Sequence, residues 1–221
     1  MFEVVPSDYS FLHMHIHPPS GGDTLWANGV EIYDRLSEKM QKYLQTLTMS
    51  CDQMESIVGS SKRAGFELYT DARGHPLNEG TNFKPVHPVV RTNPVTGKNS
   101  VYAIGLHCDH FNDVTKAESD YLKKMLLDQI TQNHDLQVRF RWLPKSCAIW
   151  DNRSGIPSFD IFWLTDQVFH AATPDFDDKY ERLGVRYTSV GEPAYFDPAT
   201  EAPVEANGNG VANGNGVTNS H

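Results

Sequence analysis

The chain has few cysteines, no long apolar run and no excess of positive charge. Its three cysteines (Cys51, Cys108 and Cys147) are odd in number and widely spaced. This spacing argues against a disulfide framework and against a zinc knuckle. No apolar stretch approaches the roughly 20 residues that a membrane-spanning helix needs, and the first residues lack the regions of a signal peptide. We therefore expect a cytoplasmic protein with reduced thiols.

The chain has fewer basic than acidic residues. Nineteen lysines and arginines stand against 28 acidic residues, which gives a formal net charge of −9. A nucleic-acid-binding surface normally shows a basic patch, and a peripheral membrane protein often shows a polybasic segment. Neither nucleic acid nor a membrane surface is expected as a partner. Composition leaves the oligomeric state open, so a homo-oligomer stays compatible with the sequence.

The C-terminal end has almost no apolar residues to bury. Residues 199–221 are dominated by alanine, asparagine and glycine, with repeated Asn-Gly pairs in Asn207–Gly216. Segments of this composition cannot form a packed core and stay disordered. We predict a single domain over residues 1–198, followed by a disordered tail.

Two helices are predicted from apolar spacing. The first covers Gly29–Thr46, where apolar residues recur at helical intervals. The second opens at Thr115, which with Glu118 forms a capping box. Its apolar face is predicted to carry Tyr121, Leu122, Met125, Leu126 and Ile130.

Most of the remaining segments are typical of short strands. In Phe11–Ile16 the residues alternate, which places Leu12, Met14 and Ile16 on one side. Similar strands are predicted at residues 86–91, 100–104, 138–142, 147–150 and 184–190, with a turn at residues 93–97. Short strands, two helices and many turns indicate a mainly β protein, a jelly-roll or cupin-like core with helices packed outside.

The region from Trp150 to Arg186 carries the clearest chemical pattern. It contains Trp-Asp-Asn-Arg at 150–153, then a lone histidine, His170, and then Arg182 and Arg186. A histidine followed a dozen residues later by an arginine is the layout of a mononuclear iron site. Each residue also has a plainer interpretation: an isolated histidine is commonly a surface or core residue, and an arginine on a strand is commonly ion-paired.

Three longer motifs support one family. They are Pro19–Trp26 (PSGGDTLW), His87–Pro94 (HPVVRTNP) and Ala148–Arg153 (AIWDNR), and together with His170 and the two arginines they resemble the α-ketoglutarate-dependent taurine/sulfonate dioxygenase family, TauD/TfdA, in its fungal branch. The resemblance runs in order from about Phe2 to Pro198. It implies a double-stranded β-helix that binds iron(II) through two histidines and a carboxylate.

The resemblance also implies roles for four residues. His170 matches an iron ligand, and Thr24 matches the threonine whose hydroxyl bonds the 2-oxoglutarate carboxylate. Arg182 matches the arginine that pairs with the same carboxylate, while Arg186 matches the arginine that binds a sulfonate substrate. The implied cofactors are Fe(II) and the cosubstrate 2-oxoglutarate. The implied reaction hydroxylates a taurine-like sulfonate or related organic anion with O2, releasing succinate, CO2 and sulfite.

Two departures from the family pattern stand out. The family's Trp-His-x-Asp segment belongs just before Phe2, so we expect this chain to lack two iron ligands and to be inactive by itself. Gly155–Gln167 is an aromatic-rich insertion between Arg153 and His170. Two hypotheses account for this insertion: a substrate lid, or an intron retained in frame.

Other histidines offer competing metal sites. Alternation places His13, His15 and His17 on one strand face, where we favour an exposed polar surface. His107 and Asp109 form a His-x-Asp sequence, but they follow Thr24 and so are out of family order. We do not take them as the iron motif.

Two further interpretations stay open. The chain is either a non-catalytic family remnant that binds an organic anion or a partner subunit through the Arg182 and Arg186 face, or a gene-model fragment without a stable fold. A fragment would expose sheet edges and apolar faces and would aggregate. Cooperative unfolding would exclude the fragment, and succinate production would exclude the remnant.

Overall fold

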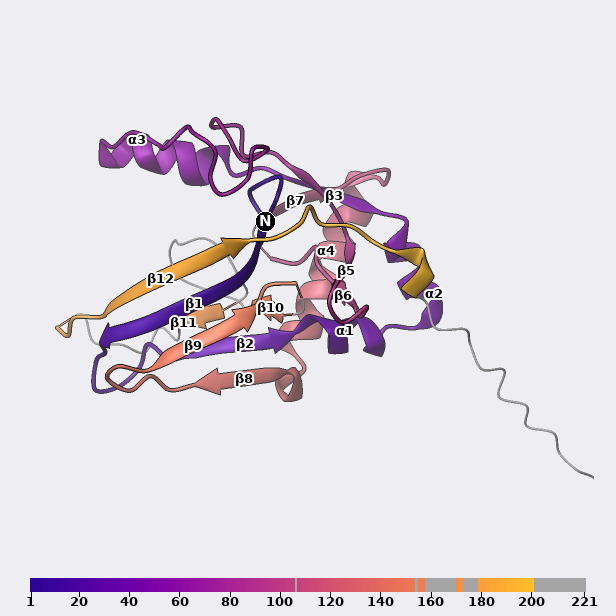
Figure 1. Ribbon diagram of the computed structural model, residues 1–221. Helices are drawn as coiled ribbons and strands as arrows, with labels where there is room; N and C mark the ends of the chain where they lie inside the picture. The colour runs from indigo at the N-terminus through magenta and orange to yellow at the C-terminus, as the bar shows by residue number, and fades with distance from the viewer. Residues whose placement is uncertain (106, 154, 158–169, 173–178, 201–221) are drawn as a thin grey trace, which may run out of the picture.

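The structure is a computed structural model that describes residues 1–105, 107–153, 155–157, 170–172 and 179–200. Its first layer is a three-stranded antiparallel sheet, here sheet A (Figure 1). β1 (Ser7–Ile16) lies at its centre, between β12 (Leu183–Val190) and β9 (Cys147–Asp151).

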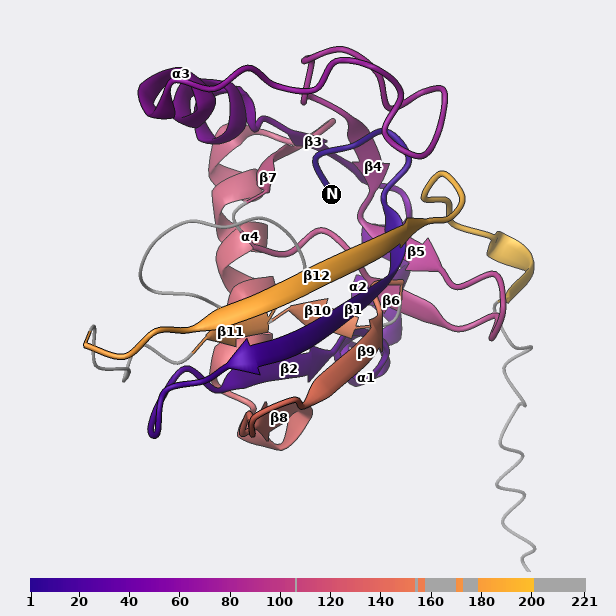
Figure 2. The ribbon, with the colours of Figure 1, turned by 60° about the vertical axis from the view of Figure 1, so that its left-hand side comes forward.

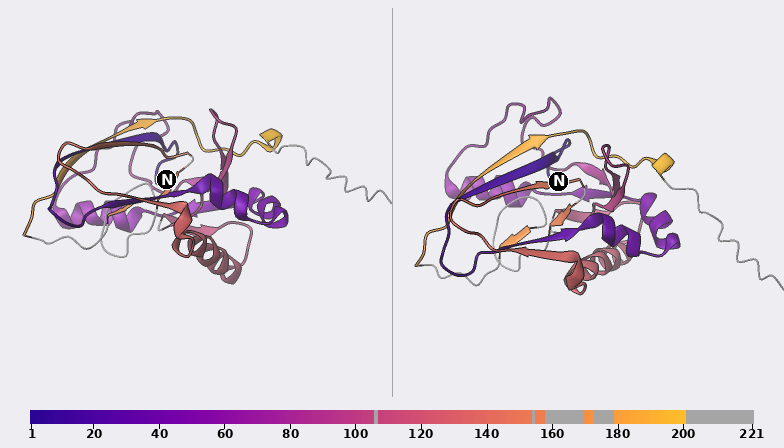
Figure 3. Two further views of the ribbon diagram at one scale, coloured as in Figure 1. Left: turned by 90° about the horizontal axis from the view of Figure 1, so that it is seen from below. Right: turned by 60° about the horizontal axis from the view of Figure 1, so that its bottom comes forward.

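The second layer, sheet B, is built around β2 (Thr24–Asn28). One edge of β2 pairs with β8 (Gln137–Phe140), and the other pairs with β10 (Gly155–Pro157) and β11 (His170–Ala172). The two sheets face each other, as Figure 3 shows. This confirms the predicted double-stranded β-helix, or jelly roll.

Helices and smaller sheets cover one end of the sandwich (Figure 2). β3 (Thr48–Cys51) pairs with β4 (Val86–Pro88) and β7 (Cys108–Phe111), and β5 (Val90–Thr92) forms a hairpin with β6 (Asn99–Val101). The helical elements are α1 (Gly29–Arg35), α2 (Glu38–Gln45), a π-helical segment (Met54–Gly59), α3 (Ser60–Ala64), α4 (Lys116–Thr131) and short 3₁₀ turns at His134–Leu136 and Pro198–Thr200. The buried apolar core fills the space among these elements, with Leu44, Met49 and Leu126 fully buried.

The helix predicted over Gly29–Thr46 is two helices, so that prediction was wrong in extent. Leu36 adopts an extended backbone (φ −72°, ψ 148°) and ends α1. Ser37 then caps α2, because its side chain accepts a hydrogen bond from the Met40 backbone N–H. Apolar spacing continues across the break, which is why periodicity alone missed it.

The helix predicted from Thr115 is confirmed as α4, capping box included. Leu122, Leu126 and Ile130 are buried as expected. Tyr121 is 69% exposed, so its assignment to the apolar face was wrong. Adjacent helical residues are rotated by about 100°, which turns Tyr121 away from the stripe that buries Leu122.

The strand predictions hold best in sheet A. β9 and β12 match to within one residue, and β1 begins earlier than predicted, at Ser7. Met14 is fully buried, but Ile16 is 40% exposed at the end of β1, against the prediction. The turn at residues 93–97 is confirmed: the Asn93 side chain accepts from the Val95 backbone N–H, and Gly97 takes a φ of 68°.

No helix in the part of the chain that the structure describes is long and apolar enough to cross a membrane. The tail from residue 201 onward, predicted to be disordered, lies outside the described residues.

Candidate active site between the two sheets

Strand register determines which side chains of sheet A point into the sandwich. On β1, Leu12 lies opposite Ala148 and Arg186, and Ser10 lies opposite Trp150. Ser10 is buried, so this row of side chains faces sheet B. The alternate row faces outward, and it includes Ile149 (69% exposed) and Tyr187 (63% exposed). Arg186 and Trp150 are therefore both on the inner face.

Four aromatic rings gather inside the sandwich. Trp26 of β2 lies 5.8 Å from Phe140 and 6.5 Å from Trp142, between ring centroids, and Phe140 lies 4.9 Å from Trp142. Trp26 also lies 5.6 Å from Trp150 of β9, a contact that crosses from sheet B to sheet A. These rings form a wall of the space between the sheets.

Thr24 is fully buried at the start of β2. Its hydroxyl oxygen accepts a hydrogen bond of 2.8 Å from the Trp142 indole N–H. A hydroxyl that accepts from an indole keeps its own hydrogen, which can be donated to an anionic oxygen. The neighbouring Asp23 carboxylate accepts from Arg139 at 2.7 Å, so that negative charge is already paired.

Arg182 reaches the same segment from just before β12. A Cβ at Gly22 would lie 3.3 Å from the Arg182 Nε, and Gly22 has a φ of +65°. Glycine is thus favoured here both by its backbone and by the close approach of the guanidinium. Desolvation lowers the pKa of Arg182, although the residue keeps contact with solvent. Arg182 makes no hydrogen bond or ion pair with another described residue.

Arg186 lies on β12 and points inward. Its Nη2 donates to the Ser10 hydroxyl at 3.1 Å, and its Cζ lies 5.4 Å from the centroid of the Trp150 ring. Ser10 also accepts from the Asn152 side-chain amide at 3.0 Å. Arg186 is therefore held on a hydroxyl and an indole ring.

His170 begins β11, where its backbone lies opposite Trp26. Its side chain lies outside the description, so its predicted role as an iron ligand stays a prediction. Pro157 at the end of β10 pairs with the same residue, Trp26. The chain thus returns at His170 to the register position that it held at Pro157. The rest of Gly155–Gln167, with its lid and intron hypotheses, lies outside the described residues.

Among the described residues, no three side chains of the metal-binding types lie close enough together to hold an ion. These residues therefore do not form a complete iron site by themselves. His13 and His15 do share a face, with ring centroids 4.4 Å apart. Asp109 bonds His110 at 2.7 Å, and burial lowers the pKa of His107 to about 3. Neither histidine group forms a rival metal centre.

A separate group of four charged residues joins two of the sequence motifs, and we call it the arginine clasp: Arg91, Asp151, Arg153 and Glu192. Arg91 Nη2 lies 2.6 Å from Glu192 Oε1, and Arg153 Nε lies 2.9 Å from Asp151 Oδ1. Arg153 Nη1 also lies 3.7 Å from Glu192 Oε2. The hydrogen bonds to Asp151 raise the pKa of Arg153 further above its ordinary value. The clasp pairs its charges internally, so its role is structural.

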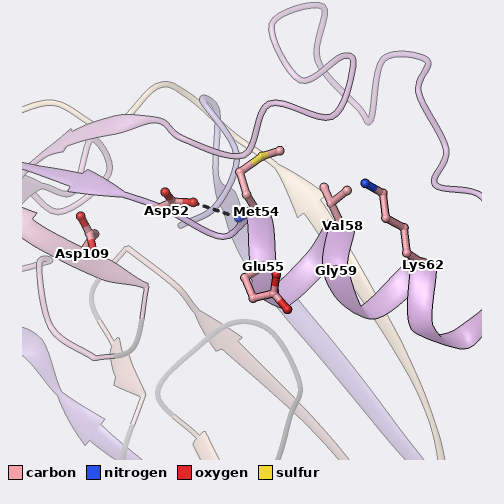
Figure 4. Close-up of a pocket in the computed structure, with 7 residues that line it drawn as sticks. All are labelled: Asp52, Met54, Glu55, Val58, Gly59, Lys62 and Asp109. Atoms are coloured by element: carbon pink, nitrogen blue, oxygen red, sulfur yellow. Dashed lines mark hydrogen bonds between the residues drawn. The ribbon is translucent and has the colours of Figure 1, made fainter.

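A cavity of about 480 Å³ lies beside α3 (Figure 4). The residues that line it come from segments outside sheets A and B. Its lining residues are Asp52, Met54, Glu55, Val58, Gly59, Lys62 and Asp109. Its carboxylates already have partners: Asp52 bonds Lys84 at 2.6 Å, and Glu55 bonds Arg63 at 2.5 Å. This cavity does not compete with the sandwich interior as the candidate site.

Three residues of the site were not predicted from the sequence: Ser10, Phe140 and Trp142. Ser10 lies on the same strand face as Leu12 and Met14. A serine among inward-facing apolar residues could have indicated a polar group in the site. Phe140 and Trp142 are two residues apart in a predicted strand, which marks an aromatic face. Their contacts with β2 carried no local signal.

Comparisons with known proteins agree on one group. The profile of the taurine catabolism dioxygenase TauD, TfdA family matches residues 1–156. The chain is 43% identical over 213 residues to alpha-ketoglutarate-dependent dioxygenase btcD of Neocamarosporium betae, covering 93% of this chain and 57% of the relative. It is 30% identical over 204 residues to an alpha-ketoglutarate-dependent sulfonate dioxygenase of Saccharomyces cerevisiae, covering 92% and 42%.

A crystal structure of a taurine dioxygenase from Burkholderia xenovorans superposes with a TM-score of 0.66 at 26% identity, covering 88% of this chain and 56% of that chain. The chain thus spans about half the length of the curated relatives that it matches.

Proposed function

Because this chain belongs to the taurine catabolism dioxygenase TauD, TfdA family, we propose that the protein is an iron(II)- and 2-oxoglutarate-dependent dioxygenase. Its proposed substrate is a sulfonate-type organic anion, as the name of the yeast relative suggests. One oxygen atom of O2 enters succinate as 2-oxoglutarate loses CO2, and the other enters the substrate. Hydroxylation of the carbon next to a sulfonate then releases sulfite.

The observation that carries this proposal is the approach of Arg182 to the segment before Thr24. The guanidinium packs on Gly22, two residues from a buried hydroxyl that still has a hydrogen to donate. A planar guanidinium binds a carboxylate through two parallel hydrogen bonds. We assign the distal carboxylate of 2-oxoglutarate to Thr24 and Arg182.

Two further assignments complete the proposal. Arg186 lies on the inner face of β12 and would bind the anionic group of the substrate. His170, whose backbone pairs with Trp26 of β2, is the candidate iron ligand. Iron supplies the dioxygen chemistry, but the described residues do not complete its ligand set.

A non-catalytic function is the second candidate, and it rests on the two arginines alone, Arg182 beside Gly22 and Arg186 on the Ser10 hydroxyl. In that case the sandwich interior binds an organic dicarboxylate or sulfonate through Arg182 and Arg186 without turnover. The chain would then be a binding remnant of the family.

Two measurements on the purified chain separate these candidates. Succinate and sulfite are assayed with Fe(II), ascorbate, 2-oxoglutarate and taurine or butane-1-sulfonate, and 2-oxoglutarate binding is measured by calorimetry. Turnover that is lost in His170→Ala supports the enzyme. Binding that needs Arg182 but yields no succinate supports the remnant, and the absence of both overturns the assignment of Thr24 and Arg182.

A further inference from the structure

The Trp-Asp-Asn-Arg motif presents its side chains to two sides in alternation. Trp150 and Asn152 face the interior: the Trp150 ring lies under the Arg186 guanidinium, and the Asn152 amide donates to Ser10. Asp151 and Arg153 face the arginine clasp. Trp150 and Asp151 are successive residues of β9 and point to opposite sides, and Asn152 and Arg153 follow in a turn, so the tetrapeptide contacts both regions.

Trp150 contacts Arg186 directly, and Asn152 is linked to it through Ser10. The Trp150 ring lies 5.4 Å from the Arg186 Cζ, which places it within reach of a cation–π interaction. The Ser10 oxygen that accepts from Arg186 Nη2 at 3.1 Å also accepts from Asn152 at 3.0 Å and is thereby fixed in place. Ser7 accepts a second bond from the same amide, at 3.1 Å, which fixes Asn152 in turn.

Trp150 itself has a support on the opposite sheet. Trp26 lies 5.6 Å away, between ring centroids, and Trp26 is also the residue opposite His170. The indole of Trp150 is thus held between the arginine on its own sheet and an aromatic side chain of sheet B. Movement of the ring would disturb both its contact with Arg186 and its contact with Trp26 on β2.

We propose that Trp150 and Asn152 are positioning residues that hold the Arg186 guanidinium in the orientation that binds the anionic head group of the substrate. The inference rests on the proposed function. A free arginine side chain loses rotamer entropy when it is fixed. The ring and the held serine remove part of that loss before the anion arrives, so affinity is gained through preorganisation.

Calorimetric titration of the purified chain tests this, with butane-1-sulfonate as the probe in the presence of saturating 2-oxoglutarate. We expect Trp150→Leu to raise the sulfonate Kd about tenfold, the scale of a partly desolvated cation–π contact. Trp150→Phe keeps a ring and should stay within about threefold of the wild type. Asn152→Ala should raise the Kd several-fold, while none of the three changes the Kd for 2-oxoglutarate.

The control for the strand is Ile149→Ala, a neighbour of Trp150 that points outward and is 69% exposed. It should leave both affinities unchanged. The decisive control is the double variant Trp150→Leu, Arg186→Met. If Trp150 acts through Arg186, the leucine substitution costs nothing more once the guanidinium is gone.

The outcomes separate the two claims. A sulfonate Kd that Trp150→Leu does not change, or that it raises equally in the Arg186→Met background, overturns the inference while 2-oxoglutarate binding stands. An unfolded Trp150→Leu leaves Asn152→Ala and its double variant with Arg186→Met to decide by the same criteria. No 2-oxoglutarate binding to the wild type overturns the proposed function and the inference with it.

Discussion

The arginine clasp and the sandwich interior use the same side chain in opposite ways. In the clasp, Arg91 is fully buried against the Glu192 carboxylate and Arg153 is bonded to Asp151. In the interior, Arg182 makes no hydrogen bond or ion pair with another described residue, and Arg186 contacts a hydroxyl and an indole ring. A buried cation that pairs with a carboxylate makes the fold depend on that carboxylate, because its removal leaves an uncompensated buried charge. The contacts with Ser10 and Trp150 place Arg186 on the inner face, where the proposed substrate anion would bind.

The clasp also gives a structural role to parts of two family motifs, His87–Pro94 and Ala148–Arg153. The clasp joins Arg91 of one motif to the end of the other, across a sequence separation that local patterns do not report. Its contribution is to fix the C-terminal end of β9, from which Trp150 faces the interior. Stability and binding should therefore respond to different substitutions.

The largest expected effect is on stability. Glu192→Ala leaves the Arg91 guanidinium buried with no carboxylate, which should lower the free energy of unfolding by about 3–5 kcal/mol. Urea denaturation measures this. The matched control is Glu55→Ala, which removes the exposed ion pair with Arg63 and should cost less than about 1 kcal/mol. Equal losses of unfolding free energy in the two variants would contradict the expectation that the clasp stabilises the fold more than an exposed ion pair does.

Acid should weaken the clasp end of the molecule at moderate pH. Burial lowers the pKa of His87 from 6.5 to about 4, and its ring lies 5.7 Å from Tyr102, over which Arg91 sits. Because the folded pKa is the lower one, the unfolded state takes up the proton first. This contribution is complete above pH 6.5 and falls by about 3 kcal/mol as the pH approaches 4.

Urea midpoints measured from pH 7.5 to 4.5 test this slope. His87→Gln should flatten most of it, although His107, whose pKa burial also lowers, retains a part. A slope that His87→Gln does not reduce would contradict the assignment.

The interior should show the reverse pattern, with binding lost and stability kept. Arg182→Met removes a partly desolvated cation that makes no ion pair with a described residue, so the melting temperature should stay or rise. The Kd for 2-oxoglutarate should rise roughly a hundredfold, the loss expected for a charge-assisted pair. Arg141→Met, at an exposed site, is the control. A large loss of stability in Arg182→Met would place it with the clasp arginines.

The smallest effect is expected from deleting Gly155–Gln167. Val168 and Phe169 would then take the places of Gly155 and Ile156 along β2, and His170 would keep its position opposite Trp26. Unfolding should stay cooperative and 2-oxoglutarate binding should persist. Loss of the fold would show that these residues are integral to sheet B, and loss of sulfonate binding alone would favour the lid hypothesis.

The family and its candidate residues were readable from motifs, and the fold class from strand alternation and turns. Strand limits in sheet A followed from alternation, and the α4 capping box followed from Thr115 and Glu118. The helix break at Leu36 and the exposure of Tyr121 did not follow. The local apolar pattern is compatible with one helix or two, and with a buried or an exposed Tyr121. Packing in the folded protein determines both.

The sequence by itself determined the mainly β architecture, the acidic surface and the set of arginines that could bind anions. Only the tertiary structure decided which arginines met carboxylates. Arg91 reaches Glu192 101 positions away, Thr24 meets Trp142 118 positions away, and Arg186 meets Ser10 176 positions away. Such contacts depend on strand order, register and the facing of two sheets. Periodicity along one strand shows which side a residue faces, but the partner on that side is set by another strand.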